Sequence, residues 1–152
     1  MPAEEGVRIL ALEQVVLDSP AFAAATPSLT SDDALVRFLT TLAGASRRLR
    51  LSSLGQSQQG RDLPLIYLTR EGLDDPLAIA RLDRPVIWLI GQQHGNEPAG
   101  GEAMLALASA LARGELAPLL GKVTVVIVPR ANVDGAAADR RVLASVRART
   151  ST

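Results

Sequence analysis

Apolar residues form two runs in the second half of the chain, at residues 85–90 and, with Thr124 as the one polar member, at 123–128. Neither run alternates with polar residues, a pattern that is typical of strands covered on both faces. Between the runs, apolar residues recur at helical spacing until Gly114, namely Met104, Leu105, Ala108, Leu111 and Ala112. A strand, a helix and a second strand in this order predict a right-handed parallel crossover.

The chain before this crossover contains an amphipathic helical pattern. Residues 30–33 are polar and suit the start of a helix. Apolar residues then recur at helical spacing until Gly44, namely Leu35, Phe38, Leu39, Leu42 and Ala43. The stripe predicts a helix that packs one face against a core.

A β-hairpin is predicted between this helix and the crossover. Residues 48–51 alternate, a turn rich in Gly and Gln follows, and residues 63–68 are mostly apolar. Pro64 places the second strand near an edge or a bulge, because proline cannot donate to a ladder. Residues 70–84 are predicted to form a solvated excursion with a helical turn after Pro76. Hairpin and crossover together predict an α/β fold with a mixed sheet of about four strands.

Composition limits the functions open to the chain. Its 152 residues carry 16 basic and 16 acidic side chains and only one Trp, one Tyr and two Phe, so neither charge nor aromatic content favours nucleic-acid binding. No apolar run approaches the roughly 18 residues of a membrane span, and we expect no membrane partner. The absence of Cys excludes disulfides and thiolate metal ligands.

Residues 1–29 are interpreted as a leader of uncertain structure. Residues 9–17 are mostly apolar, which suits an export signal, but Glu4 and Glu5 precede the first Arg and Glu13 interrupts the apolar stretch. Both features are unfavourable in a signal peptide. A cytoplasmic location is therefore favoured over secretion or the periplasm.

Candidate chemistry lies where the two apolar runs end. His94 and Glu97 follow the first run and precede a helical pattern that begins beside Pro98, and residues 129–135 follow the second run. Ligands of open α/β sheets bind at the carboxyl ends of the strands, and both ends open on the same edge. An imidazole and a carboxylate three residues apart, with Gly95 to turn the backbone, suit one metal ion. This spacing predicts half of a zinc site.

Each of these residues also has a purely structural interpretation. An isolated His at a strand end is commonly structural, and Glu97 alone would favour the positive end of the following helix. Asn132 and Asp134 are good turn formers beside Gly135. The motif around His94 favours the metal-ligand interpretation for that residue.

Three segments together resemble the N-terminal part of the zinc carboxypeptidases of the M14 family, over about residues 29–141. They are Leu-Gly-Gln-Ser with Gly-Arg-Asp-Leu-Pro-Leu within residues 54–65, His-Gly-Asn-Glu-Pro at 94–98, and Pro-Arg-Ala-Asn-Val-Asp-Gly at 129–135. Three ordered motifs are more specific than His-x-x-Glu alone. Val133 departs from the proline that the family has in the last motif.

The resemblance implies a three-layer fold of the zinc-carboxypeptidase type, here only in part. It also implies that His94 and Glu97 are the first two zinc ligands and that Arg140 or Arg141 is a substrate-binding arginine. The substrate of the complete family is a peptide C-terminus. Its later motifs supply a second zinc His and a catalytic Glu, yet this chain contains one His and no identifiable catalytic residue. We therefore expect weak binding to an incomplete zinc site and no activity of this chain alone.

Residues 142–152 no longer resemble the family, and we interpret them as a divergent basic tail produced by truncation or a frameshift. If the absent part normally covers the sheet, the exposed sheet favours self-association. Two other interpretations stay open. One is a zinc deacylase similar to aspartoacylase and succinylglutamate desuccinylase, although the Asn-x-Asp-Gly segment favours the carboxypeptidases. The other is a non-catalytic module or remnant.

Overall fold

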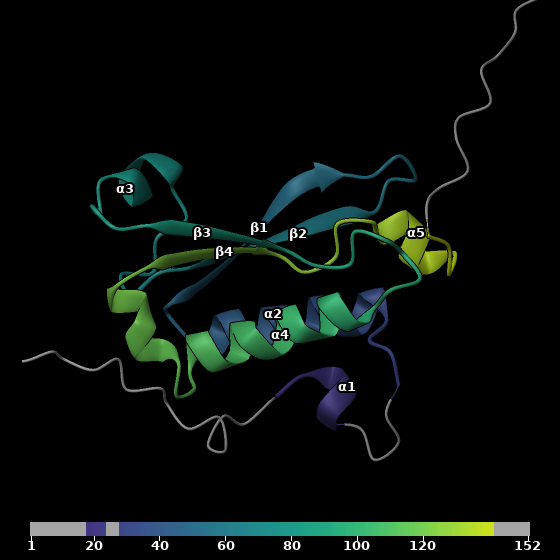
Figure 1. The fold of residues 1–152 in the computed structure, drawn as a ribbon, viewed down its shortest axis with the longest axis horizontal. Coiled ribbons are helices and arrows are strands. Elements are labelled where there is room, and N and C mark those ends of the chain that lie inside the picture. The colour runs from purple at the N-terminus through teal and green to yellow at the C-terminus, as the bar shows by residue number, and fades with distance from the viewer. Residues whose placement is uncertain (1–17, 24–27, 142–152) are drawn as a thin grey trace, which may run out of the picture.

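One four-stranded sheet organises the computed structural model, which describes residues 18–23 and 28–141 (Figure 1). The strand order is β1 (Leu49–Gln56), β2 (Asp62–Leu68), β4 (Thr124–Val128) and β3 (Val86–Ile90). The pairs β1–β2 and β2–β4 are antiparallel, and β3–β4 is parallel. The sheet is therefore mixed, as predicted. Most of the leader and the tail at 142–152 lie outside the described residues.

Helices lie on both faces of the sheet and make a three-layer α/β fold. The long helices α2 (Asp32–Ala45) and α4 (Ala99–Ala112) cover one face, and the short helix α3 (Pro76–Ala80) lies on the other (Figure 1). The remaining short helices are α1 (Pro20–Ala23), which packs outside the long helices, η2 (Ala117–Gly121) and α5 (Val133–Ala137). Within the described residues, no helix is both long enough and apolar enough to cross a lipid bilayer.

The two long helices begin where the sequence predicts. Ser31 caps α2, because its side-chain oxygen accepts a hydrogen bond from the Ala34 amide at 3.2 Å. The helix continues one residue beyond Gly44, since a single glycine lowers helix stability without ending it. Helix α4 follows Pro98 directly and packs beside α2 against the sheet. Together they bury the main core, which includes Leu39, Leu42, Leu49, Ile66, Leu105 and Ile127.

The predicted hairpin is confirmed, and of the two expected settings of Pro64 the structure shows the bulge. Strand β2 has neighbours on both sides, so it is not an edge strand. Pro64 is paired with Ser53, where the register of β1 shifts before Gln56, and pairing with β4 is confined to Ile66–Leu68. The proline therefore lies at a bulge and outside the second ladder, where its missing N–H leaves no bond unmade.

Strand β3 is not covered on both faces, so that prediction is wrong for the described part of the chain. Strand β4 lies between β2 and β3, which leaves β3 with one neighbour and makes it an edge strand. Trp88 is 54% exposed and Ile90 51% exposed. In the described residues, the continuous apolar run therefore belongs to a partly exposed edge strand.

Candidate metal centre

The loops that follow β3 and β4 lie side by side, as the sequence predicts. The Gly91 amide donates to the Val128 carbonyl at 2.8 Å, the Ala131 amide to the Gly91 carbonyl at 3.0 Å, and the Asn132 amide to the Gln92 carbonyl at 3.1 Å. We call residues 91–98 the ligand loop. These bonds hold it against the segment that precedes α5.

His94 and Glu97 meet on the outer side of the ligand loop. His94 Nδ1 lies 3.0 Å from Glu97 Oε2, and the Glu97 amide donates to the His94 carbonyl at 3.1 Å to close the turn. Both side chains are partly open to solvent, at 39% and 54% exposure. A cavity of about 460 Å³ adjoins them and is lined by the ligand loop, by Ile90 at the end of β3 and by the first turns of α4 up to Met104.

The spacing of these two side chains suits a zinc ion. Imidazole nitrogen and carboxylate oxygen bind zinc at about 2.0–2.2 Å, so neighbouring ligands in a tetrahedral arrangement lie about 3.3 Å apart. The 3.0 Å separation of Nδ1 and Oε2 is close to that value. Residues 18–23 and 28–141 contain no group of three or more His, Cys, Asp or Glu able to hold a metal. The fit to zinc within these residues therefore rests on the His94–Glu97 pair alone.

Of the two candidate arginines, Arg141 contacts the pair. Its guanidinium Nη1 bonds to Glu97 Oε1, whereas Arg140 contributes main-chain bonds through its amide, which donates to the Gly135 carbonyl at 2.8 Å. The hydrogen bond from His94 is the main cause that holds the pKa of Glu97 below its usual value, and the charge of Arg141 lowers it further. The lowered pKa keeps this carboxylate ionised to more acidic pH, and the ionised form is the one that metal ligation requires.

The Asn-Val-Asp-Gly segment supports the site and lies outside it. Asn132 caps α5 by accepting from the Gly135 amide at 2.9 Å, which confirms its interpretation as a turn former. Asp134 is 1% exposed and accepts from the Ser57 hydroxyl at 2.7 Å and the Gln59 amide at 3.2 Å. Two motifs that are far apart in the sequence thus meet at one buried carboxylate.

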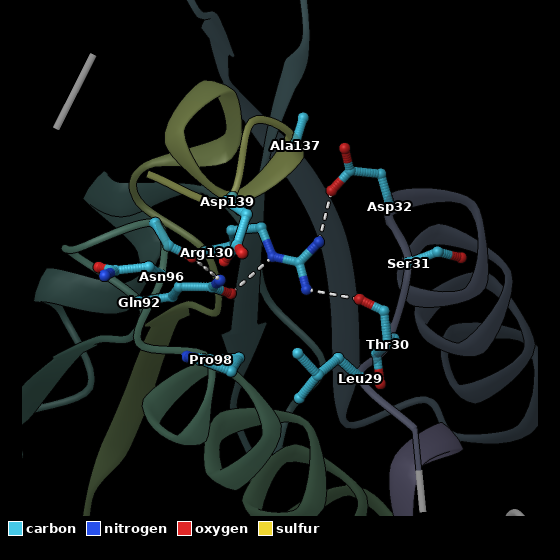
Figure 2. Close-up of a pocket in the computed structure, with 12 residues that line it drawn as sticks. Leu29, Thr30, Ser31, Asp32, Gln92, Asn96, Pro98, Arg130, Ala137 and Asp139 are labelled. Atoms are coloured by element: carbon cyan, nitrogen blue, oxygen red, sulfur yellow. Dashed lines mark hydrogen bonds and ion pairs between the residues drawn. The ribbon is translucent and has the colours of Figure 1, made fainter. Parts of the chain in front are cut away.

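Sequence reasoning missed two buried polar residues beneath the ligand loop, Gln92 and Arg130. Each lies two residues beyond the end of a strand, at a position where the apolar pattern predicts no specific role. The available signal was an Arg at the end of an apolar run, because a buried guanidinium requires partners. They line a second cavity of about 360 Å³ on the inner side of the loop (Figure 2).

The fold is a three-layer α/β fold with a mixed sheet, and comparison with known proteins identifies its family. Residues 35–151 match the zinc carboxypeptidase family, so the chain belongs to that family. This match includes most of the segment 142–152 that the motifs leave outside the resemblance.

Individual relatives are similar over part of their length. Carboxypeptidase 2 of Trichophyton rubrum is 34% identical over 130 residues, which are 84% of this chain and 24% of that protein. The crystal structure of carboxypeptidase A from Helicoverpa armigera superposes with a TM-score of 0.58 at 21% identity, over 71% of this chain and 25% of that chain. A metallo-carboxypeptidase from Burkholderia cenocepacia gives a TM-score of 0.55 at 20% identity, over 73% of this chain and 29% of that chain. The chain thus spans about a quarter of the length of these relatives.

Proposed function

We propose that His94 and Glu97 are two protein ligands of a catalytic zinc ion in a metallocarboxypeptidase, which removes C-terminal residues from peptides. The observation that supports this proposal is the 3.0 Å separation of Nδ1 and Oε2 at the carboxyl end of β3. Relatives similar over this region are named carboxypeptidases, which favours peptides over acylated amino acids as substrates.

Each residue of the site has a stated role in this proposal. A bound zinc ion supplies a Lewis acid for the scissile carbonyl and a water of lowered pKa. His94 and Glu97 hold the ion, and Gly95, whose backbone φ is not positive, lets the loop between them pack closely against the main chain of α5. Arg141 neutralises Glu97 in this structure and offers a 60% exposed guanidinium to a substrate carboxylate or carbonyl.

In this proposal the described residues supply two of the protein ligands of the zinc ion. The chain has a single His, and catalytic zinc sites use three protein ligands with one open position. A polypeptide of this sequence alone therefore offers two ligands and no group identified as a general base. We expect it to bind zinc weakly and to lack peptidase activity.

Zinc stoichiometry on the purified 152-residue polypeptide tests the metal site. We expect weak binding by titration calorimetry that is lost in His94→Ala and Glu97→Gln. The matched control is Glu115→Gln, which removes an exposed carboxylate far from the ligand loop and leaves binding unchanged. Tight binding of one zinc per chain that persists in His94→Ala would overturn the assignment.

A peptidase assay tests the expected inactivity of this polypeptide. Reporter peptides with free and blocked C-termini are offered with added zinc, and we expect no release of C-terminal residues. Losing general-base catalysis alone removes roughly 10²- to 10⁴-fold in rate. Release that a chelator stops and that His94→Ala abolishes would show that the 152 residues form a complete site.

A further inference from the structure

Gln92 has an unusual conformation for a residue inside the ligand loop. Its φ angle is 40°, in the left-handed region that non-glycine residues rarely occupy, and its side chain is buried at 6% exposure. Such a conformation persists only where surrounding contacts determine it. Here the Gln92 side chain spans the loop, because Nε2 donates to the Gly95 carbonyl at 2.8 Å. The acceptor residue, Gly95, lies between the zinc-ligand candidates His94 and Glu97 in the sequence.

Arg130 sets the orientation of the Gln92 amide. Its Nε donates to Gln92 Oε1 at 2.7 Å, and an Arg Nε–H can only donate. The oxygen of the amide must therefore face Arg130, which leaves Nε2 to donate to the Gly95 carbonyl. Reversing the amide would break both bonds, so the two bonds depend on each other.

The terminal nitrogens of the Arg130 guanidinium are in turn held by Thr30 and Asp32 (Figure 2). It is 5% exposed; Nη1 bonds to Asp32 Oδ1 at 2.5 Å and Nη2 to the Thr30 carbonyl at 2.7 Å. The Glu102 carboxylate fixes Thr30 by accepting from its amide and its hydroxyl, both at 2.7 Å. A continuous set of buried bonds therefore connects α4 and the start of α2 to the ligand loop.

We infer that Arg130 and Gln92 are positioning residues that fix the Gly95 carbonyl and, through it, the separation of His94 and Glu97. Both side chains direct their polar atoms to protein partners, so neither is placed as a metal ligand. Partners of metal ligands that lie one bond further out commonly set ligand orientation and metal affinity. The role in zinc binding rests on the proposed function, whereas the control of loop geometry does not.

The chain offers a matched pair of variants for the test. Gln92→Glu keeps the size of the side chain and an acceptor for Arg130, but it places a carboxylate oxygen where Nε2 donates to the Gly95 carbonyl. Gln93→Glu makes the same chemical change on the next residue, which is exposed on the same loop. Arg130→Lys keeps the positive charge beside Asp32 and removes the planar fork.

The first readout is hydrogen exchange of the Gly95 and Glu97 amides in the 152-residue polypeptide. Both amides are hydrogen-bonded, to the Arg141 and His94 carbonyls respectively. We expect Gln92→Glu to accelerate their exchange by roughly 10- to 100-fold, as for loss of a buried hydrogen bond, and Arg130→Lys to act in the same direction. Gln93→Glu leaves the rates unchanged. Equal rates in Gln92→Glu and Gln93→Glu, or acceleration spread evenly through α2, α4 and the sheet, would overturn the inference.

The second readout is the ¹⁵N shift of the His94 ring, which reports the bond to Glu97 and the response to added zinc. We expect Gln92→Glu to move the shift toward that of a free ring and to weaken the zinc response by roughly 10-fold or more. If the unaltered chain shows no zinc response, the proposed function fails and the exchange rates still decide the positioning role. The His94 ring shift could instead respond equally to zinc in the unaltered chain and in Gln92→Glu, with equal exchange rates in the two chains. In that case the positioning role fails and the proposed function does not.

Discussion

Gly95 is the residue on which the candidate metal centre most directly depends. An added Cβ would lie 2.1 Å from the Gly135 carbonyl carbon, 2.4 Å from the Ala136 nitrogen and 2.4 Å from the Arg140 oxygen. All three atoms belong to the main chain, so none of them can move aside cheaply. Glycine at this position lets the ligand loop contact α5 and brings Arg141 to Glu97.

We predict that Gly95→Ala lowers the free energy of unfolding by about 3 kcal/mol, because it separates the ligand loop from α5. Urea denaturation measures this change. Gly44→Ala is the control, since no atom lies within 4 Å of its added Cβ and alanine favours the helix. That variant is expected to gain roughly 0.5–1 kcal/mol. Equal effects of the two variants would contradict the contact between loop and α5.

Among the elements, α5 and the β1–β2 hairpin are joined by Asp134. Its carboxylate accepts from Ser57 and Gln59 and lies 3.3 Å from Arg61 Nε, all at the hairpin turn. Asp134 is almost fully buried, and a buried carboxylate requires hydrogen-bond and ion-pair partners such as these. The bond network therefore holds the hairpin turn against the helix that contacts the ligand loop.

Replacement of this carboxylate tests its contribution. Asp134→Asn removes the charge and one acceptor while it keeps the shape, and we predict a loss of about 2–4 kcal/mol in unfolding free energy. Asp139→Asn changes an exposed residue beyond α5 and should stay within about 0.5 kcal/mol of the unaltered chain. If chemical denaturation showed an equally small loss of unfolding free energy for Asp134→Asn, the Asp134 bonds would not hold the hairpin turn against α5.

A second ion pair connects the segments before and after α3. Glu71 pairs with Arg84 through both carboxylate oxygens, and Arg84 also bonds to the Thr124 hydroxyl at 3.3 Å. The hydrogen bond from Arg84 is the main cause that lowers the pKa of Glu71 below its ordinary value of 4.5. Since the folded pKa is lower than the unfolded one, the pair stabilises the fold above about pH 4.5.

We predict that the stability difference between the unaltered chain and Glu71→Gln depends on pH. Near pH 7 the unaltered chain should be more stable by up to about 1 kcal/mol, the upper range for an exposed pair. The difference should shrink as the pH falls from about 4.5 through the lowered pKa of Glu71. Denaturant unfolding at pH 7 and pH 3 measures it. A difference that stays constant over this interval would contradict the ion pair.

At the scale of the whole molecule, the sheet has an open apolar edge at β3 within the described residues. Alternate residues of a parallel strand bond to one neighbour, and β3 uses Pro85 and Gly91 toward β4. Val86, Trp88 and Ile90 therefore direct their main-chain groups away from the sheet. Their side chains are 41%, 54% and 51% exposed. An unpaired apolar edge of this kind favours pairing with another strand.

We predict that the 152-residue polypeptide self-associates through β3. Sedimentation velocity should show a mass that rises with concentration, and the fluorescence of the single Trp should shift to shorter wavelength. Trp88→Lys should reduce association, because lysine disfavours edge pairing. Leu77→Lys is the control, since Leu77 is 70% exposed on α3 and lies outside the edge. A monomer at all concentrations would contradict this prediction.

Local sequence patterns predicted most of the elements and the central pair of the site. The cap at Ser31 depends on residues within one turn, and the strands and helices of the hairpin and the crossover each follow from the pattern within one segment. His94 and Glu97 are likewise three residues apart in one turn, so their proximity follows from the local chain. Side-chain spacing and main-chain preferences are sufficient for features of this kind.

Tertiary structure decided the rest, because those contacts join residues that are distant in the sequence. It placed β4 between β2 and β3, which left β3 exposed although its apolar run is the one expected of a covered strand. It also brought Arg141 to Glu97, Arg130 to Gln92 and Asp134 to Ser57. Which buried polar groups find each other depends on how the layers pack and what each desolvated group requires. The sequence alone thus determined the elements and the family motifs, and packing determined the supports of the ligand loop.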